Sequence, residues 1–395
     1  QPRSRGLGDV YKRQCYGGKY TEREKQRSMK RIGIVTFFQS YNYGVWFQAY
    51  ATQAFLRGRG YDAQIVNYSN LHDDEKLKMA FKGKNSYMGY LISFAKNILF
   101  GGMHYYRKGF KKHLNTFYSL SSEHCTQIEN LSDLHYDVLV AGSDQIWNPE
   151  TTGGTLDPVF LLQFGIADKR ISYASSIGST EIREQDKALM KKALEEFSYI
   201  SVRETFAKQQ LEKIMNRNIN VVCDPTFLLT GEEWRLFAKQ YSDYLENDQK
   251  YILTYFVSLE KYSEHCINLV KTYSESLGLP VWAVQFTRYY SKNCDKKILG
   301  ASIADMIRLI EHAELIITDS FHGVALSVNL GKNFVAVENR GNPYRTRNLL
   351  SRLNLLDRID MDIENYSKVD YSNVTVLLND FRKESVDWFC EAIEN

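Results

Sequence analysis

The feature that most constrains the fold of this chain is a repeated alternation of short apolar runs with amphipathic helical stretches. It begins near residue 31, where an apolar run (32–38) leads through a turn-rich segment (39–44) into a helical pattern (45–57) and then an extended run (63–68). This is one strand–helix–strand unit. Consecutive units of this kind predict a parallel sheet with helices on both faces.

The same alternation falls into two series along the chain. Further strand-like runs lie at 136–141, 170–175, 199–203 and 221–223 in the first series and, after a polar stretch at 231–250, at 251–257, 281–286, 315–318 and 334–337 in the second. Helical patterns between them occupy 185–196, 206–215, 261–277, 302–313 and 321–330. We therefore predict an α/β protein with two Rossmann-like domains that face each other across a cleft, at 29–230 and 231–372, and a C-terminal helix within 373–395 that returns to the first domain.

The positive formal charge of the chain comes from its first residues. Residues 1–28 contain eight Lys/Arg and three Asp/Glu, so a net charge of +3 for the chain leaves −2 for residues 29–395. This leader has no apolar periodicity, and we expect it to be disordered or to lie upstream of a true start at Met29. Because residues 29–395 are not basic and carry no nucleic-acid-binding motif, we expect no nucleic-acid partner.

The cysteines, histidines and hydropathy disfavour several protein classes. The six cysteines form no CxxC pair, and the eight histidines show no metal-ligand spacing with them or with carboxylates, so no metal is predicted. No apolar run is long enough for a membrane span or a secretory signal. Nucleotide-binding glycine loops and serine-hydrolase elbows are also absent from the sequence. A cytoplasmic location follows.

A basic and aromatic insertion is predicted at 76–114. It contains nine Lys/Arg and eight Phe/Tyr but no Asp or Glu. One interpretation is a flap that contacts a lipid-linked saccharide or the inner face of the membrane. The other is a pair of helices whose charges are simply solvated.

Polar segments directly follow two strands of the first series. Asn42-Tyr43-Gly44 precedes a helix, where Asn42 and Gly44 could help to hold an anion at the helix start. Gly142 to Pro149 follows the strand-like run 136–141 and contains Asp144, a strand-end acid suited to binding a sugar hydroxyl. Asp144 could instead cap a helix. Acceptor contacts are predicted for Ser143, Gln145, Trp147 and Asn148.

Two further segments place cationic groups at strand ends. Arg203 ends the run 199–203 and is suited to a two-bond grip on a carboxylate or phosphate, although it could merely pair with Glu204. Thr318 to Gly323 follows an apolar strand and places His322 in the first turn of a helix, where a bound anion would favour its protonated form. Ser320 and Gly323 are predicted to join the same anion site.

Taken together, these motifs resemble the polysaccharide pyruvyl transferase family. The segments that carry the resemblance, in the order of the family, are Asn42-Tyr43-Gly44, Gly142 to Pro149, Ser201 to Glu204, Asp224-Pro225 and Thr318 to Gly323. The resemblance extends from about Arg31 to Asp357. It implies a fold like that of the GT-B glycosyltransferases, with phosphoenolpyruvate as a co-substrate and no other cofactor.

The resemblance also implies a reaction and roles for three residues. The acceptor would be a saccharide of a cell-surface polymer, free or lipid-linked, and the product a cyclic pyruvate ketal. Arg203 and His322 match donor-contacting positions, and Asp144 matches an acid near the acceptor. We expect His322 to protonate the donor and Asp144 to act as base.

One position departs from the family pattern. Some members carry a second arginine just before the histidine, where this chain has Ser320-Phe321. Arg345 or Arg347 is predicted to replace it.

Two other functions stay open from the sequence. A nucleotide-sugar glycosyltransferase would share the fold and would need a carboxylate for the ribose hydroxyls, for which Glu311 and Glu314 are the candidates. A saccharide-binding protein without turnover is the second, and Ser320-Phe321 in place of the arginine is the feature that supports it.

Overall fold

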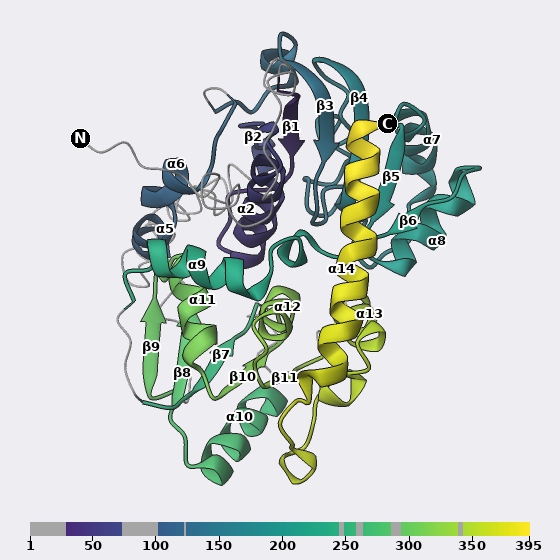
Figure 1. Ribbon diagram of the computed structural model, residues 1–395. Helices are drawn as coiled ribbons and strands as arrows, with labels where there is room; N and C mark the ends of the chain where they lie inside the picture. The colour runs from purple at the N-terminus through teal and green to yellow at the C-terminus, as the bar shows by residue number, and fades with distance from the viewer. Residues whose placement is uncertain are drawn as a thin grey trace, which may run out of the picture.

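Two separate parallel sheets organise the molecule. The computed structural model describes residues 29–72, 102–121, 124–244, 249–257, 264–285, 294–338 and 343–395. One sheet has six strands and the other five, and each is covered by helices (Figure 1). The prediction of two Rossmann-like α/β domains is confirmed.

The first sheet has the strand order β2-β1-β3-β4-β5-β6. Its strands are β1 (Arg31–Val35), β2 (Asp62–Ile65), β3 (His135–Ala141), β4 (Ile166–Ser175), β5 (Tyr199–Val202) and β6 (Asn220–Val221), and its helices include α2 (Tyr43–Gly58), α7 (Glu184–Leu194) and α8 (Thr205–Ile214). Alternate side chains of β3 enter different cores: Val138 and Val140 pack on one face, and Leu139 and Ala141 on the other. Both faces are thus buried, as in other parallel sheets.

The second sheet has the strand order β11-β10-β7-β8-β9. Its strands are β7 (Ile252–Tyr255), β8 (Val281–Gln285), β9 (Lys296–Leu299), β10 (Leu315–Thr318) and β11 (Phe334–Ala336), and its helices are α9 (Gly231–Tyr241), α10 (Glu264–Leu277), α11 (Ile303–His312), α12 (Phe321–Asn329) and α13 (Pro343–Arg352).

Three of these elements were not foreseen: strand β9, helix α9 and helix α13, the last of which lies outside every helical pattern identified in the sequence. Edge strand β9 opens with two exposed lysines and therefore lacks an apolar run. Helix α9 lies in the stretch that was interpreted as only polar. It starts at a capping box formed by Thr230 and Glu233, and it buries Trp234 on its apolar face.

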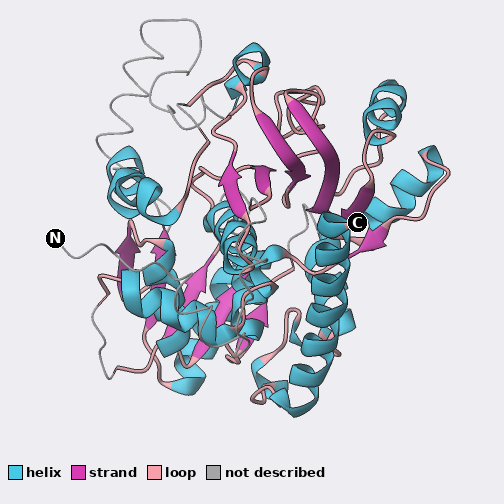
Figure 2. Ribbon diagram, turned by 45° about the horizontal axis from the view of Figure 1, so that its top comes forward, coloured by secondary structure: helices cyan, strands magenta, loops and turns pink. Residues whose placement is uncertain are grey.

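The C-terminal helix α14 (Tyr371–Glu394) runs from the second domain along the first, as Figures 1 and 2 show. The ring of Phe389 stacks on that of Tyr173 in β4, with 4.2 Å between their centroids. Ser385 Oγ accepts a hydrogen bond from the Cys223 amide at 2.9 Å. The last helix therefore completes the core of the first domain.

The predicted basic-aromatic insertion is described only from residue 102. Its described part forms α5 (Gly102–Gly109), a 3₁₀ turn (Lys111–His113) and α6 (Leu114–Phe117). Phe110 is fully buried and stacks on Trp46 of α2, whereas Lys108 and Lys111 are exposed. Residues 76–101 of the predicted flap lie outside the described residues. Among those described, no helix has both the length and the apolar character needed to cross a bilayer.

Candidate active site

In each sheet the strand order reverses at one point, and the helices that follow the strands at these two points are in contact. The reversal lies between β1 and β3 in the first sheet and between β7 and β10 in the second. Open α/β sheets bind ligands beyond the carboxyl ends of the strands at this point. Helices α2 and α12, which follow β1 and β10, are in contact there. A Cβ atom added to Gly44 would lie only 2.0 Å from His322 Nδ1, so glycine is required for this approach.

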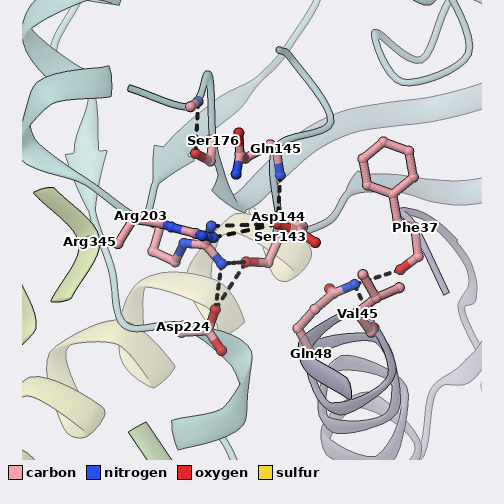
Figure 3. Close-up of polar contacts among 12 residues, drawn as sticks. Phe37, Val45, Gln48, Ser143, Asp144, Gln145, Ser176, Arg203, Asp224 and Arg345 are labelled. Atoms are coloured by element: carbon pink, nitrogen blue, oxygen red, sulfur yellow. Dashed lines mark hydrogen bonds and ion pairs between the residues drawn. The ribbon is translucent and has the colours of Figure 1, made fainter. Parts of the chain in front are cut away.

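Arg203 lies at the centre of a buried charged cluster, shown in Figure 3. Its side chain is only 3% exposed. Nε donates to Glu204 Oε1 at 3.0 Å, and Nη1 donates to Asp224 Oδ2 at 2.8 Å and to Ser143 Oγ at 3.2 Å. Nη2 lies 3.7 Å from Asp144 Oδ1 and has no hydrogen-bond partner among the described residues. Burial disfavours the cation, but the three carboxylates outweigh it and raise the Arg203 pKa.

Arg345 of α13 brings a second guanidinium to the same carboxylate. Its Nη1 lies 3.7 Å from Asp144 Oδ1, and its Nε is buried without a hydrogen-bond partner in the described part of the chain. Both guanidiniums point towards Asp144 in Figure 3. Burial and the charge of Arg203 lower the Arg345 pKa. An anion bound between the two guanidiniums would therefore reduce their mutual repulsion.

Phe321 supports both arginines. The guanidinium carbons of Arg203 and Arg345 lie 5.2 and 5.7 Å from the centre of its ring. Cations at this distance from an aromatic face are attracted by its negative charge density. The phenylalanine thus occupies the position before His322 where some family members have arginine, and Arg345 supplies the second guanidinium from α13.

His322 faces Asp224 within this cluster. Its side chain is 5% exposed, and Nε2 lies 3.6 Å from Asp224 Oδ2 without a hydrogen-bond partner among the residues described. Burial of Asp224 opposes its ionisation, but His322, Arg203 and the Thr226 amide outweigh burial and lower the Asp224 pKa. The histidine therefore faces a carboxylate that stays ionised.

Asp144 is held in an unusual backbone conformation. Its φ is +76°, in the left-handed region that side-chain-bearing residues seldom adopt. Its carbonyl accepts from the Ser176 amide at 3.0 Å, and Oδ1 accepts from the Gln145 amide at 2.9 Å. These bonds hold the carboxylate between the two arginines. It caps a turn and not a helix.

A family comparison agrees with the sequence motifs. The model of the polysaccharide pyruvyl transferase family matches residues 42–341, which is most of the chain. The chain belongs to this family. The predicted resemblance is confirmed, and the match includes Asp144, Arg203 and His322.

Solved structures of other proteins are similar over most of the chain. A UDP-N-acetylglucosamine 2-epimerase from Rickettsia bellii shares 9% identity at a TM-score of 0.49, covering 93% of this chain and 98% of that one. A glycosyltransferase from Rickettsia africae ESF-5 shares 14% at 0.43, covering 93% and 100%. The glycosyltransferase SnogD from Streptomyces nogalater shares 11% at 0.44, covering 91% and 96%. No protein with a curated description matches the chain.

Three of the predicted acceptor contacts are buried and bonded within the protein itself. Ser143 is fully buried and binds Arg203 and Asp224. Trp147 is 1% exposed and donates its indole N–H to the Phe160 carbonyl at 3.0 Å, so little of its surface is open to a sugar ring. Asn148 is buried and donates to Gln145 Oε1 at 2.8 Å. Trp147 and Asn148 therefore shape the loop, and Ser143 supports Arg203.

The predicted donor contacts divide in a similar way. Asn42 Oδ1 accepts from the Gly44 amide at 2.9 Å, and Ser320 Oγ accepts from the Gly323 amide at 3.3 Å. These two amides therefore already have partners in the caps of α2 and α12. Arg347 is half-exposed and donates to Glu338 at 2.6 Å, outside the cluster. Arg203 and Arg345 are therefore the remaining candidates.

The carboxylates considered for nucleotide binding are both engaged elsewhere. Glu311 pairs with Arg235 and Arg308. Glu314 pairs with Lys250 and Lys368. Neither belongs to the cluster around Asp144.

A cavity of about 260 Å³ lies beside the loop that follows β3 and not at the charged cluster. Its walls come from Trp147 to Glu150, from Ile177 to Arg183 and from α7.

In the described residues, no group of three or more His, Cys, Asp or Glu side chains is arranged to hold a metal ion.

Sequence reasoning left Asp224 without a role. It follows strand β6 as Asp144 follows β3, so the strand-end rule could have selected it. Its closeness to His322 depends on the packing of the two domains, which no sequence pattern displays.

Proposed function

We propose that this chain transfers the pyruvyl group of phosphoenolpyruvate to a saccharide of a cell-surface polysaccharide, or to its lipid-linked precursor, to form a pyruvate ketal. One observation carries the proposal. Arg203 Nη2, Arg345 Nε and His322 Nε2 lie in one buried cluster, and each lacks a hydrogen-bond partner among the described residues. Buried donors without partners are costly, and an anionic substrate would satisfy them.

The charges of the cluster leave a place for one more proton. Two guanidiniums face the carboxylates of Asp144, Glu204 and Asp224. Protonation of His322 balances this set. Phosphoenolpyruvate carries a carboxylate and a phosphate, which suit two arginines, and its negative charge favours the imidazolium form of His322.

The reaction requires a proton donor at the enol carbon and a base at the acceptor. His322 gives its proton to C3, which becomes the methyl group, and a cationic centre forms at C2. One sugar hydroxyl adds to C2 and loses its proton to Asp144. A second hydroxyl then displaces phosphate from C2, so that inorganic phosphate leaves and the ketal closes. The two hydroxyls release two protons in total. One of them restores the proton that His322 gave to C3, and the other protonates the departing phosphate.

The proposed setting is the cytoplasm, with acceptors presented free or at the inner face of the membrane. The described insertion residues Lys108 and Lys111 are exposed and could contribute to that contact. No metal and no further cofactor is required by this chemistry.

The assay is phosphate release from phosphoenolpyruvate with purified chain and a panel of polysaccharide repeat-unit saccharides. We expect release that depends on the acceptor, together with a new methyl singlet in the proton NMR spectrum of the saccharide. Calorimetry should detect binding of phosphoenolpyruvate but not of UDP or GDP. Nucleotide binding without phosphoenolpyruvate binding would favour a glycosyltransferase, and donor binding without release would favour a non-catalytic protein.

Replacement of the proposed acid provides the mutational test. We expect His322→Ala to lower turnover by roughly 10²–10⁴, the usual contribution of a positioned acid or base. His265→Ala is the control, because His265 lies on α10 and pairs with Asp360 away from the cluster. Near-normal turnover in His322→Ala would remove this histidine from the mechanism.

A further inference from the structure

We infer that Asp224 is the positioning residue of this site: it fixes Arg203 through a hydrogen bond and presents a negative charge 3.6 Å from His322 Nε2, which favours the imidazolium form that acts as the acid. The inference rests on the proposed function, in which His322 is the acid. Asp224 touches no substrate in this scheme. It acts through His322 and Arg203.

The two oxygens of Asp224 have separate partners. Oδ1 accepts from the Thr226 amide at 3.0 Å and from Thr226 Oγ1 at 2.8 Å. Oδ2 accepts from Arg203 Nη1 at 2.8 Å and from Ser143 Oγ at 3.3 Å, and it faces His322 Nε2 at 3.6 Å. One oxygen therefore fixes the local turn, while the other connects the arginine with the histidine.

The backbone that carries Asp224 is firmly anchored. Asp224 leads into a 3₁₀ turn, Pro225–Phe227, which packs against both α2 and α12. The Asn329 amide group at the end of α12 donates to the carbonyls of Thr226 at 2.9 Å and Leu229 at 2.8 Å. Arg382 Nε of α14 donates to the Phe227 carbonyl at 2.8 Å. The carboxylate thus has a fixed place relative to His322.

The imidazole is confined on two sides by residues that precede the second domain. Asp224 lies near Nε2, and the Cα of Gly44 lies against the Nδ1 side of the ring. The side chain itself belongs to α12 in the second domain. The acid is therefore fully positioned only when the two domains are packed together.

Charged groups on the surrounding elements act in opposite directions on His322. The cations Arg203 and Arg345 of the same cluster would disfavour an imidazolium, whereas the carboxylate of Asp144 would favour it. The phenols of Tyr43 and Tyr255 are uncharged near neutral pH, because burial raises their pKa values further. Asp224, with its carboxylate oxygen 3.6 Å from Nε2, is the group whose loss should alter the protonation of His322 most.

The experiment compares Asp224→Asn with the full-length wild type. Asparagine keeps an oxygen for the Thr226 contacts but removes the charge. We expect turnover to fall at least tenfold at neutral pH. The alkaline limb of the pH–rate profile should move to lower pH by about one unit, because an unpaired imidazole loses its proton more readily. Ser143→Ala is the matched control, since it removes another partner of Oδ2 without changing the charge, and its profile should keep its position.

An NMR titration of His322 without substrate separates the test of Asp224 from the test of the proposed function. NMR of chain labelled at its histidine rings should show the His322 titration midpoint at lower pH in Asp224→Asn, and also in Asp224→Gly should asparagine prevent folding. An unmoved midpoint, or a turnover loss with an unmoved pH profile, overturns the inference. Because the titration needs no phosphoenolpyruvate, a moved midpoint in a chain that never releases phosphate would reject the proposed function and leave the coupling of Asp224 to His322 intact.

Discussion

At the scale of single residues, the chemistry depends on which charges are buried together. Arg203 is enclosed by Glu204, Asp224 and Asp144, yet one of its nitrogens has no hydrogen-bond partner among the described residues. A buried arginine with that much compensation keeps its charge and still has donor capacity for a ligand. Arg203 does pair with Glu204, as the alternative interpretation expected, but it also contacts Asp224 and Asp144.

We predict that Arg203→Lys raises the donor dissociation constant at least tenfold, with a smaller effect on turnover. A lysine ammonium cannot reproduce the planar grip and also bind Glu204 and Asp224. Calorimetry with phosphoenolpyruvate measures the effect, and a thermal melt measures the accompanying loss of stability. An unchanged dissociation constant would clear Arg203 of donor binding.

Arg345 and Arg347, both in α13, provide an internal comparison. We predict that Arg345→Gln weakens phosphoenolpyruvate binding at least tenfold, because it removes a buried guanidinium beside Asp144. Arg347→Gln should change binding little, since Arg347 pairs with Glu338 at the surface. The same calorimetric titration serves for both. Equal effects, or the reverse order, would contradict the assignment of Arg345.

At the scale of elements, the first turns of α2 and α12 are the place where the two domains meet. Sequence periodicity predicted both helices and the strands before them, because a continuous apolar run indicates a strand that is buried on both faces. It did not predict β9, which opens with two exposed lysines, or α9 and α13, in which charged residues alternate with the apolar ones. Caps such as Thr230 and Glu233 were the available signal for α9.

We predict that Gly44→Ala lowers turnover roughly 10²-fold, the effect of misplacing a reacting group by about 1 Å. The added methyl group would collide with the His322 ring, so the ring or the domain packing must shift. Steady-state kinetics measures the change. Ala54→Gly in the same helix should cost about 1 kcal/mol of stability without this kinetic effect. If Gly44→Ala turned over normally, the close approach would have no catalytic role.

At the scale of the whole molecule, α14 links the second domain to the core of the first. Phe389 is fully buried between Tyr173 and Phe55. Segments near both ends of the described chain thus share one core, since the Lys30 ammonium also donates to the Ile393 carbonyl at 3.1 Å. This arrangement favours joint unfolding of the two domains.

We predict that Phe389→Ala lowers the free energy of unfolding by about 3–5 kcal/mol, because it leaves a cavity beside β4. Denaturant unfolding followed by fluorescence measures it. Val376→Ala on the same helix is the control, since Val376 is 55% exposed and its loss should cost no more than about 0.5 kcal/mol. A small effect of Phe389→Ala would show that α14 contributes little to the first domain.

The sequence alone determined the α/β class, the two series of strands, the family and the segments at the strand ends. Local periodicity and turn chemistry suffice for these, since each is set by residues close together in the chain. The tertiary structure decided which side chains of those segments meet. It placed Trp147 in the core, chose Arg345 over Arg347, and set Asp224 beside His322. Such contacts join residues far apart in sequence, and only the packing of the two sheets fixes their distances.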